Sequence, residues 1–191
     1  MKNFIVGSIA LYCFGMMVYA IWSYLAFVGL EKRDWVGSLV YIPHGVRVMA
    51  MCYFGYRSIP ALYAIEITGP IMVYPEQYFD VWPIASIASL LSVVAACEIV
   101  KWSNSNTKGT IFMPINFTNY RSLVLVIVLS GLLNAISSNL VTSYLAGIDL
   151  SVTVIARFFI GDVIGASVLV LFLSALFTTL RVNRLLVSDK L

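Results

Sequence analysis

Four charged side chains stand inside long apolar runs of the sequence: Arg47, Glu66, Arg157 and Asp162. A charge at the centre of a bilayer costs roughly 2.5–3.5 kcal/mol on insertion scales, so it normally faces the interior of a helical bundle and has a partner there. Their charges sum to zero. The pattern predicts a buried polar centre that either holds the bundle together or binds a small ligand.

Helical rise predicts which of these charges meet. Arg47 lies nine residues before Tyr56, and Glu66 lies nine residues after Arg57. Both therefore lie about 13 Å from the turn at 56–57, and on adjacent antiparallel helices they form a natural pair. Asp162, midway along the last apolar run, approaches the same cluster, and Arg157 lies a turn and a half nearer the outer surface.

The residues around Arg47 add a second candidate feature. Pro43 favours a helix start, and His44 and Arg47 share a face of that helix because they are three residues apart. Free N–H groups at the helix start, an imidazole and a guanidinium together favour an anion such as a carboxylate. The alternative is structural: Arg47 is satisfied by Glu66 or Asp162, and His44 bonds a neighbouring carbonyl.

Other chemistry finds little support in the sequence. His44 is the only histidine, which excludes a histidine-cluster metal site, and a Ser-His-Asp triad would need His44 as its base without any nucleophile-elbow motif. Cys13, Cys52 and Cys97 all fall in apolar runs and form no C-x-x-C pair. We therefore expect no enzymatic activity, no cofactor, no metal and no disulfide.

The composition sets the class of protein that must position these residues. The chain has 191 residues, of which 61% are hydrophobic and 11% are charged, too few to coat a globule in water. It predicts one all-α transmembrane domain, residues 1–191. Each crossing needs about 20 apolar residues, and six runs qualify: 4–30, 35–56, 58–74, 81–100, 122–146 and 151–180. The second helix spans either the whole of its run or only 43–56, with residues 36–42 at the interface or re-entrant, because Pro43 favours a helix start.

The distribution of charge predicts the orientation, because cytoplasmic segments retain Lys and Arg. With six crossings, the termini share a side with the loops that contain eight basic residues: Lys2, Arg57, Lys101, Lys108, Arg121, Arg181, Arg184 and Lys190. The other side has Lys32 and Arg33 and most of the acids: Glu31, Asp34, Glu76, Asp80 and Asp149. Both termini are therefore expected in the cytoplasm, and Glu98 is expected to pair with Lys101 at the cytoplasmic rim.

Small and polar residues predict how the helices pack. Gly161 and Gly165 bracket Asp162 and leave a bare helix surface beside it. A second small-residue stripe runs along the fourth apolar run: Ala85, Ser89, Ser92 and Ala96. Interhelical hydrogen bonds are expected from a polar group in the fifth: Asn134, Ser137, Ser138 and Asn139. An aromatic belt is expected at the outer interface: Trp35, Tyr41, Tyr74, Tyr78 and Trp82.

Two segments resemble a known family. IPHGVRVMAMCYFGYRSIPALYAIEITG (residues 42–69) and RFFIGDVIG (residues 157–165) are similar to the proline-glycine helix and the last-helix motif of first-type membrane-associated sensor domains of bacterial histidine kinases and diguanylate cyclases. Those domains are longer and precede a cytoplasmic signalling domain, so the resemblance implies a free-standing relative that acts through another chain. The length and span number also resemble, more loosely, the S components of energy-coupling-factor transporters.

Three functions follow as hypotheses. The first is a sensory or regulatory module of the bacterial inner membrane, with His44, Arg47, Glu66, Arg157 and Asp162 as its polar centre. The second is a ligand-binding transport subunit, and the third is a structural accessory subunit of a larger membrane complex. The expected partners are the lipid bilayer, another protein in the membrane or at its cytoplasmic face, and a small anionic ligand, but no nucleic acid.

Overall fold

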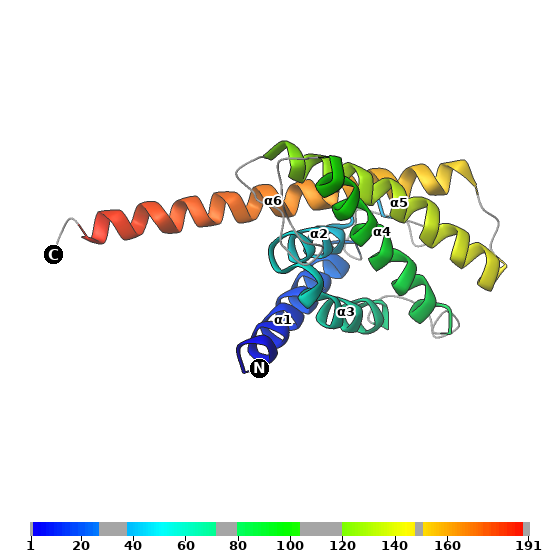
Figure 1. Ribbon diagram of the computed structural model, residues 1–191, viewed down its shortest axis with the longest axis horizontal. Coiled ribbons are helices and arrows are strands. Elements are labelled where there is room, and N and C mark those ends of the chain that lie inside the picture. The colour runs from blue at the N-terminus through cyan, green and yellow to red at the C-terminus, as the bar shows by residue number, and fades with distance from the viewer. Residues whose placement is uncertain (1, 27–37, 72–79, 104–119, 148–150, 189–191) are drawn as a thin grey trace.

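The computed structural model describes residues 2–26, 38–71, 80–103, 120–147 and 151–188. These ranges are almost entirely helical, which confirms the predicted all-α class (Figure 1). The elements are α1 (Lys2–Leu25), α2 (Ile42–Phe54), the 3₁₀ helix η2 (Gly55–Ser58), α3 (Ile59–Ile71), α4 (Trp82–Ser103), α5 (Tyr120–Ala146) and α6 (Val152–Ser188).

Four of these helices are long and apolar enough to cross a membrane. They comprise Phe4–Leu25, Trp82–Ser103, Tyr120–Leu145 and Val152–Leu180. The other two, α2 and α3, have 13 residues each. Such a helix is about 20 Å long, shorter than the hydrocarbon core of a bilayer. The second and third apolar runs are therefore each represented by a short helix, which for α2 agrees with the predicted start at Pro43.

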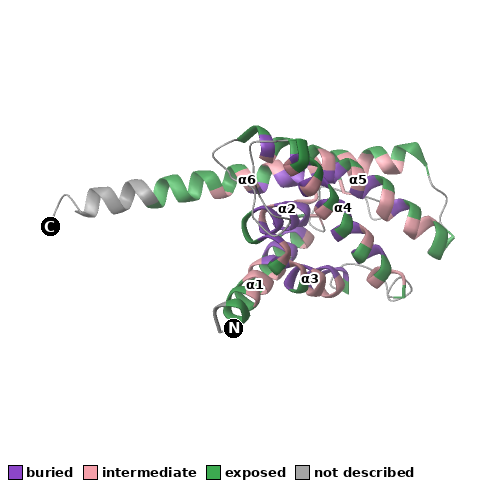
Figure 2. Cartoon of the chain, viewed as in Figure 1, coloured by how far each residue is buried: buried purple, intermediate pink, exposed green. Residues whose placement is uncertain are grey.

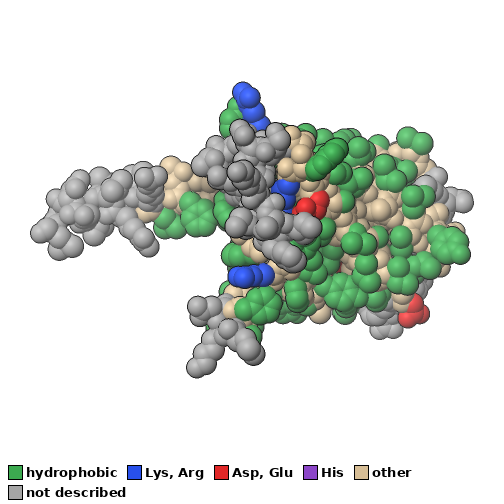
Figure 3. All heavy atoms as spheres, viewed as in Figure 1, with side chains coloured by type: hydrophobic (Ala, Val, Ile, Leu, Met, Phe, Trp, Pro, Cys, Tyr) green, Lys and Arg blue, Asp and Glu red, His purple; other side chains and the backbone are tan. Residues whose placement is uncertain are grey.

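The short helix α2 lies at the centre of the bundle. It contacts α1, α3, α4, α5 and α6, and nine of its 13 residues are buried, as Figure 2 shows by its purple ribbon. The long helices instead expose apolar side chains over much of their surface, as expected of helices that face lipid (Figure 3). The bundle thus surrounds α2, and the polar residues of α2 lie inside it.

Local sequence determines both ends of α2. Pro43 lies in the first turn, where its missing N–H leaves no bond unmade. The helix ends at Gly55, whose φ of 60° suits glycine, and the Gly55 N–H donates to the carbonyl of Met51. The η2 turn then leads into α3, and Ser58 Oγ donates to the carbonyl of Gly55 at 2.7 Å.

The backbone that precedes α2 lies directly against α6. The Tyr41 N–H donates to the carbonyl of Gly161 at 2.9 Å. A Cβ on Gly161 would meet the backbone of Ser38, and one on Gly165 would meet the backbone of Tyr41. The Gly161 and Gly165 pair predicted as a bare surface therefore contacts a non-helical segment, residues 38–41, rather than a helix.

The other packing predictions are mostly confirmed. The four small residues of the α4 stripe are all buried, and Ser92 Oγ lies 2.7 Å from Ser137 Oγ of α5. Asn139 instead donates to its own helix, at the carbonyl of Ala135. Tyr41, predicted as part of an outer belt, packs its ring edge-on against Tyr19 and Trp22 of α1. Three belt residues lie outside the described ranges: Trp35, Tyr74 and Tyr78.

The close approach of α6 to residues 38–41 predicts a selective effect of added methyl groups. Gly165→Ala should lower the free energy of unfolding by about 1–3 kcal/mol, the range of overpacked sites, because the backbone of Tyr41 must move. The control is Gly7→Ala, since a Cβ there has open space. The free energy of unfolding of both variants is measured by denaturation in detergent. Equal stability of the two variants would exclude the close contact between Gly165 and the backbone of Tyr41.

Candidate functional site

Polar side chains from α2, α3, α5 and α6 meet in the middle of the bundle. We call His44, Arg47, Glu66 and Asp162 the polar centre. All four are buried, although buried ionisable groups are rare in proteins and rarer in membranes. The polar centre contains four of the five predicted site residues.

Arg47 and Glu66 form the first half of the polar centre. Arg47 Nε lies 3.2 Å from Glu66 Oε1, which confirms the pair predicted from helical rise. The guanidinium also lies over the Tyr41 ring, 5.3 Å from its centroid. The ion pair links α2 to α3. Ser86 of α4 donates to the backbone carbonyl of Glu66 at 3.2 Å, and this hydrogen bond links α3 to α4.

His44 and Asp162 form the second half. His44 Nδ1 lies 3.7 Å from Asp162 Oδ2, and His44 Nε2 lies 3.0 Å from Ser130 Oγ of α5. Asn134, also on α5, donates to Asp162 Oδ2 at 2.6 Å, and Ser138 donates to Asn134 Oδ1 at 2.8 Å. A continuous polar chain therefore joins α2, α5 and α6.

The spacing of Ser130, Asn134 and Ser138 indicates that all three belong to the polar network. The sequence prediction does not include Ser130, and it gives Asn134 and Ser138 interhelical hydrogen bonds or, as the alternative, a place lining a polar cavity. The three residues recur every four positions and so lie on one face of α5. A polar residue at every fourth position of a largely apolar helix is the signal that identifies the face turned toward Asp162.

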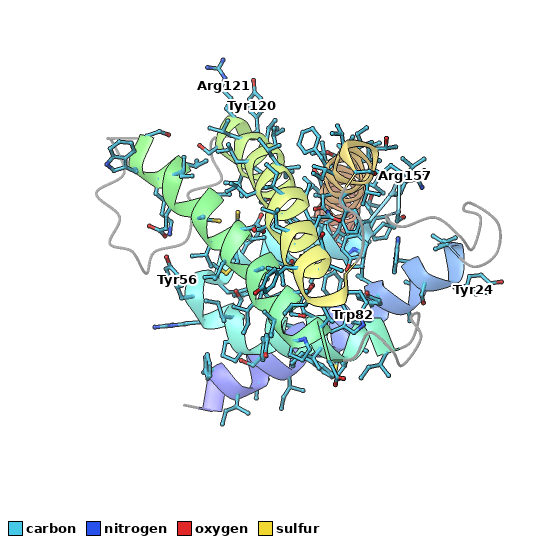
Figure 4. The ribbon with its side chains drawn as sticks, turned by 90° about the vertical axis from the view of Figure 1, so that its right-hand side faces the viewer. Tyr24, Tyr56, Trp82, Tyr120, Arg121 and Arg157 are labelled. Atoms are coloured by element: carbon cyan, nitrogen blue, oxygen red, sulfur yellow. The ribbon has the colours of Figure 1, made fainter. Side chains whose placement is uncertain are left out.

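Arg157 does not join the polar centre. It is only partly buried, and Figure 4 shows its side chain on the side of α6 that faces away from α5. Arg157 precedes Asp162 by five residues, which is well over one turn of helix, so the two side chains point in different directions. Asp162 interacts instead with Asn134 and His44.

Ser130, His44 and Asp162 stand in the order of a Ser-His-Asp triad. Their geometry differs from that of a hydrolase, because the nucleophile of such an enzyme is exposed at a sharp turn. Ser130 is 0% exposed, lies within α5, and donates to the carbonyl of Ile127 at 3.2 Å. This arrangement favours a structural role, in which the three side chains hold α5, α2 and α6 together. Among the described residues, no group of three or more His, Cys, Asp and Glu side chains could hold a metal ion.

The hydrogen bonding of the polar centre is incomplete. Five buried side-chain atoms in the described part of the chain lack a hydrogen bond of good geometry, and three of them belong to the centre: His44 Nδ1, Arg47 Nε and Glu66 Oε1. Buried polar groups in native proteins are nearly always hydrogen-bonded, so such exceptions point to a strained, switching or ligand-binding site. The three atoms instead lie in the two close contacts already described, Arg47 Nε against Glu66 Oε1 and His44 Nδ1 against Asp162 Oδ2, so the polar centre is held by polar contacts of imperfect hydrogen-bond geometry.

An aromatic cluster borders the polar centre on the side of α1. Tyr19 and Trp22 of α1 pack edge-on against each other and against Tyr41. Trp22 Nε1 donates to the carbonyl of Val40 at 2.7 Å, and the Tyr41 hydroxyl donates to that of Tyr19 at 3.4 Å. The cluster ties α1 to the segment before α2 and encloses the guanidinium of Arg47.

A second, separate polar cluster lies at the turn between α2 and α3. Tyr56 of η2 donates to Glu98 Oε1 at 2.8 Å, and Lys101 Nζ lies 2.8 Å from the same oxygen, which confirms the predicted Glu98–Lys101 pair. Desolvation and the hydrogen bond to Glu98 raise the pKa of Tyr56 to about 12, so Tyr56 remains a donor at neutral pH. The turn is thereby attached to the end of α4 (Figure 4).

Comparison with protein-family models, with curated proteins and with solved structures finds no match for this chain. The fold and the site therefore define its class: an all-α protein with four helices suited to crossing a membrane and a buried polar centre around the short helix α2.

The ion pair predicts strong coupling between Arg47 and Glu66. Arg47→Ala should lower the free energy of unfolding by about 3–5 kcal/mol, because it leaves a buried carboxylate without its partner. Arg47→Ala combined with Glu66→Ala should recover part of that loss. Denaturant unfolding of the purified protein in detergent measures both values.

The control is the more exposed pair at the second cluster. Lys101→Ala should lower the free energy of unfolding by only about 0.3–0.5 kcal/mol, as for other helical surface pairs. Additive losses from Arg47→Ala and Glu66→Ala would show that the two side chains do not interact in the folded protein.

Proposed function

We propose that this protein is a non-catalytic sensory or regulatory module of a bacterial inner membrane, in which the polar centre is the responsive element. The observation that carries the proposal is the incomplete hydrogen bonding of His44, Arg47 and Glu66 inside the bundle. Ionisable side chains inside a membrane-spanning bundle are taken as functional by default. The resemblance to membrane-associated sensor domains leads to the same class of function.

Helix α6 supports a route by which such a module would signal. It carries Asp162 in the polar centre and continues without a break to Ser188. Gly131 of α5 faces Asp162 and Val163 of α6, and the two helices run in opposite directions (Figure 1). Because α5 begins at Tyr120, the same register places the start of α5 beside Phe172 of α6. The rest of α6 projects beyond the bundle (Figure 1). A rotation or shift at Asp162 would therefore reach the far end of α6.

The projecting part of α6 also supports a protein partner. Phe177 is 65% exposed and Leu180 is 52% exposed, and both stand at the end of the apolar stretch Val152–Leu180, whose 29 residues are more than a bilayer's hydrocarbon core requires. We place the cytoplasmic boundary at the level of Arg121, a basic residue, which leaves Phe177 and Leu180 beyond the lipid. An apolar surface beyond the lipid is unfavourable unless another protein covers it. The partner would contact α6 at the cytoplasmic face, where a signalling chain would be reached.

The proposal includes six crossings with both termini in the cytoplasm. The contact of Tyr56 with Glu98 and Lys101 supports an α2–α3 turn at the same level as the end of α4. The described ends of α1 and α6 that are nearest the termini lie toward one side of the molecule (Figure 1). On the face in Figure 3, basic side chains gather toward that side with one acidic side chain among them, and another acidic side chain lies toward the opposite end.

A structural accessory subunit is the second candidate function. It is favoured by the fact that Arg47 and Glu66 pair within the chain and that Asp162 is bonded by Asn134. In this case the polar centre would only hold α2 in place. The two candidates differ in what Asp162→Asn should do: a structural role predicts lower thermal stability, and a regulatory role predicts near-normal melting with an altered response of the partner.

The topology is tested by cysteine labelling in a chain whose three native cysteines are replaced by alanine. Arg57 and Asp80 are both exposed, so Arg57→Cys and Asp80→Cys form a matched pair. A membrane-impermeant maleimide should label Asp80→Cys from outside the intact cell, and Arg57→Cys only after permeabilisation. Labelling of Arg57→Cys from outside, or from neither side, would favour four crossings with α2 and α3 inserted as a hairpin from the outer face.

The partner is tested by photo-crosslinking and purification of the full chain from native membranes. Phe177→Ala with Leu180→Ala should abolish the crosslinked partner without changing the melting temperature. The control is Leu91→Ala, because Leu91 is 60% exposed on α4 within the span. Equal loss in both variants, or no effect of either, would exclude α6 as the partner's binding surface.

A further inference from the structure

The polar centre holds an excess of acidic groups. Arg47 carries one positive charge, Glu66 and Asp162 carry one negative charge each when ionised, and a neutral His44 adds nothing. Arg157, which would have balanced the sum, points away from α5 (Figure 4). His44 is 0% exposed and Asp162 is 1% exposed, so one uncompensated negative charge there is strongly unfavourable. A single additional proton makes the polar centre neutral.

The hydrogen-bond directions indicate where that proton lies. Ser130 Oγ lies 3.0 Å from His44 Nε2 and 3.2 Å from the carbonyl oxygen of Ile127, and its single hydrogen can serve only one of these two acceptors. When Ser130 donates to Ile127, its oxygen accepts from His44 Nε2, and that nitrogen carries the ring hydrogen. On the other side of the ring, Nδ1 lacks a hydrogen bond and faces Asp162 Oδ2 at 3.7 Å. An unprotonated Nδ1 beside an ionised carboxylate would place a lone pair against a negative charge.

A proton on either atom changes this contact from repulsive to attractive. On Nδ1 it gives an imidazolium beside a carboxylate, and on Oδ2 it gives a carboxylic acid that donates to a neutral imidazole. We propose that His44 Nδ1 and Asp162 Oδ2 share one exchangeable proton, so that the polar centre is a proton-binding site. Asn134 Nδ2 donates to the same oxygen at 2.6 Å and holds the carboxyl group in position.

The surrounding groups leave His44 and Asp162 as the place for this proton. Among the described residues, the charged groups that act on the pair are Arg47 of α2 and Glu66 of α3, and the titratable side chains of Tyr41 and Tyr19 lie beside Arg47. Glu66 already has Arg47 as its partner. Helix α5 contributes the neutral side chains Ser130 and Asn134.

Loss of the proton would leave a negative charge between α2 and α6. The contact between the two helices would weaken, and α6 would be free to shift relative to α2. This use of the proton as a signal rests on the proposed function, whereas the presence of the proton does not.

The test uses the fact that His44 is the only histidine of the chain. The full chain, purified with an affinity tag that contains no histidine and labelled with ¹⁵N-histidine, is placed in lipid nanodiscs. Nitrogen NMR then shows which ring nitrogens carry hydrogen, and infrared spectroscopy shows any protonated carboxylic acid. Asp162→Asn removes the acid, and Glu98→Gln, at the second cluster, serves as the control.

Two spectra support the proposal: both ring nitrogens protonated, or Nε2 alone protonated together with a carboxylic-acid band. In the second case, the band is lost in Asp162→Asn and kept in Glu98→Gln. A singly protonated imidazole without any carboxylic-acid band overturns the proposal, and the wild-type spectra alone decide this if Asp162→Asn does not fold. If the proton is present but Asp162→Asn leaves the captured partner unchanged, the proposed function fails and the proton site stands.

Discussion

Ionisable groups in a low-dielectric interior must be matched by partners, and this requirement governs the position of α2. The helix has only 13 residues. Apolar contacts alone would not fix its position inside the bilayer, because lipid tails are as apolar as leucine. Arg47 requires Glu66 of α3, and His44 lies between Ser130 of α5 and Asp162 of α6. These two residues determine where α2 sits and which helices surround it.

Close backbone contact makes this arrangement possible. The Tyr41 N–H can reach the carbonyl of Gly161 only because Gly161 and Gly165 carry no side chain on that face of α6. The segment before α2 is thereby held against α6, and His44 enters the bundle at the level of Asp162. The aromatic cluster of Tyr19, Trp22 and Tyr41 then links the same segment to α1. Small residues and directional bonds thus supply specificity that apolar packing lacks.

The two halves of helix α6 lie in different environments. Its first half packs against α2 and α5 and carries Asp162, whereas its second half projects past the start of α5 with exposed apolar side chains such as Phe177. A helix is stiff over this distance because its backbone is bonded internally at every turn. A change in charge at Asp162 and a change in position at the end of α6 are therefore physically connected, which is what a regulatory module requires.

The sequence by itself determined the features that depend on length and rise. The four long helices, the start of α2 at Pro43, the common level of Arg47 and Glu66 and the buried stripe of α4 all follow from residue counts and local preferences. Only the tertiary structure decided how each helix is rotated about its axis: that Tyr41 turns inward, that Arg157 points away, and that Ser130 and Asn134 reach His44 and Asp162. In a soluble protein an apolar stripe reveals that rotation. Here both the lipid-facing and the buried sides are apolar, so the hydrophobic pattern is nearly the same all round each helix, and only side-chain partners select the angle.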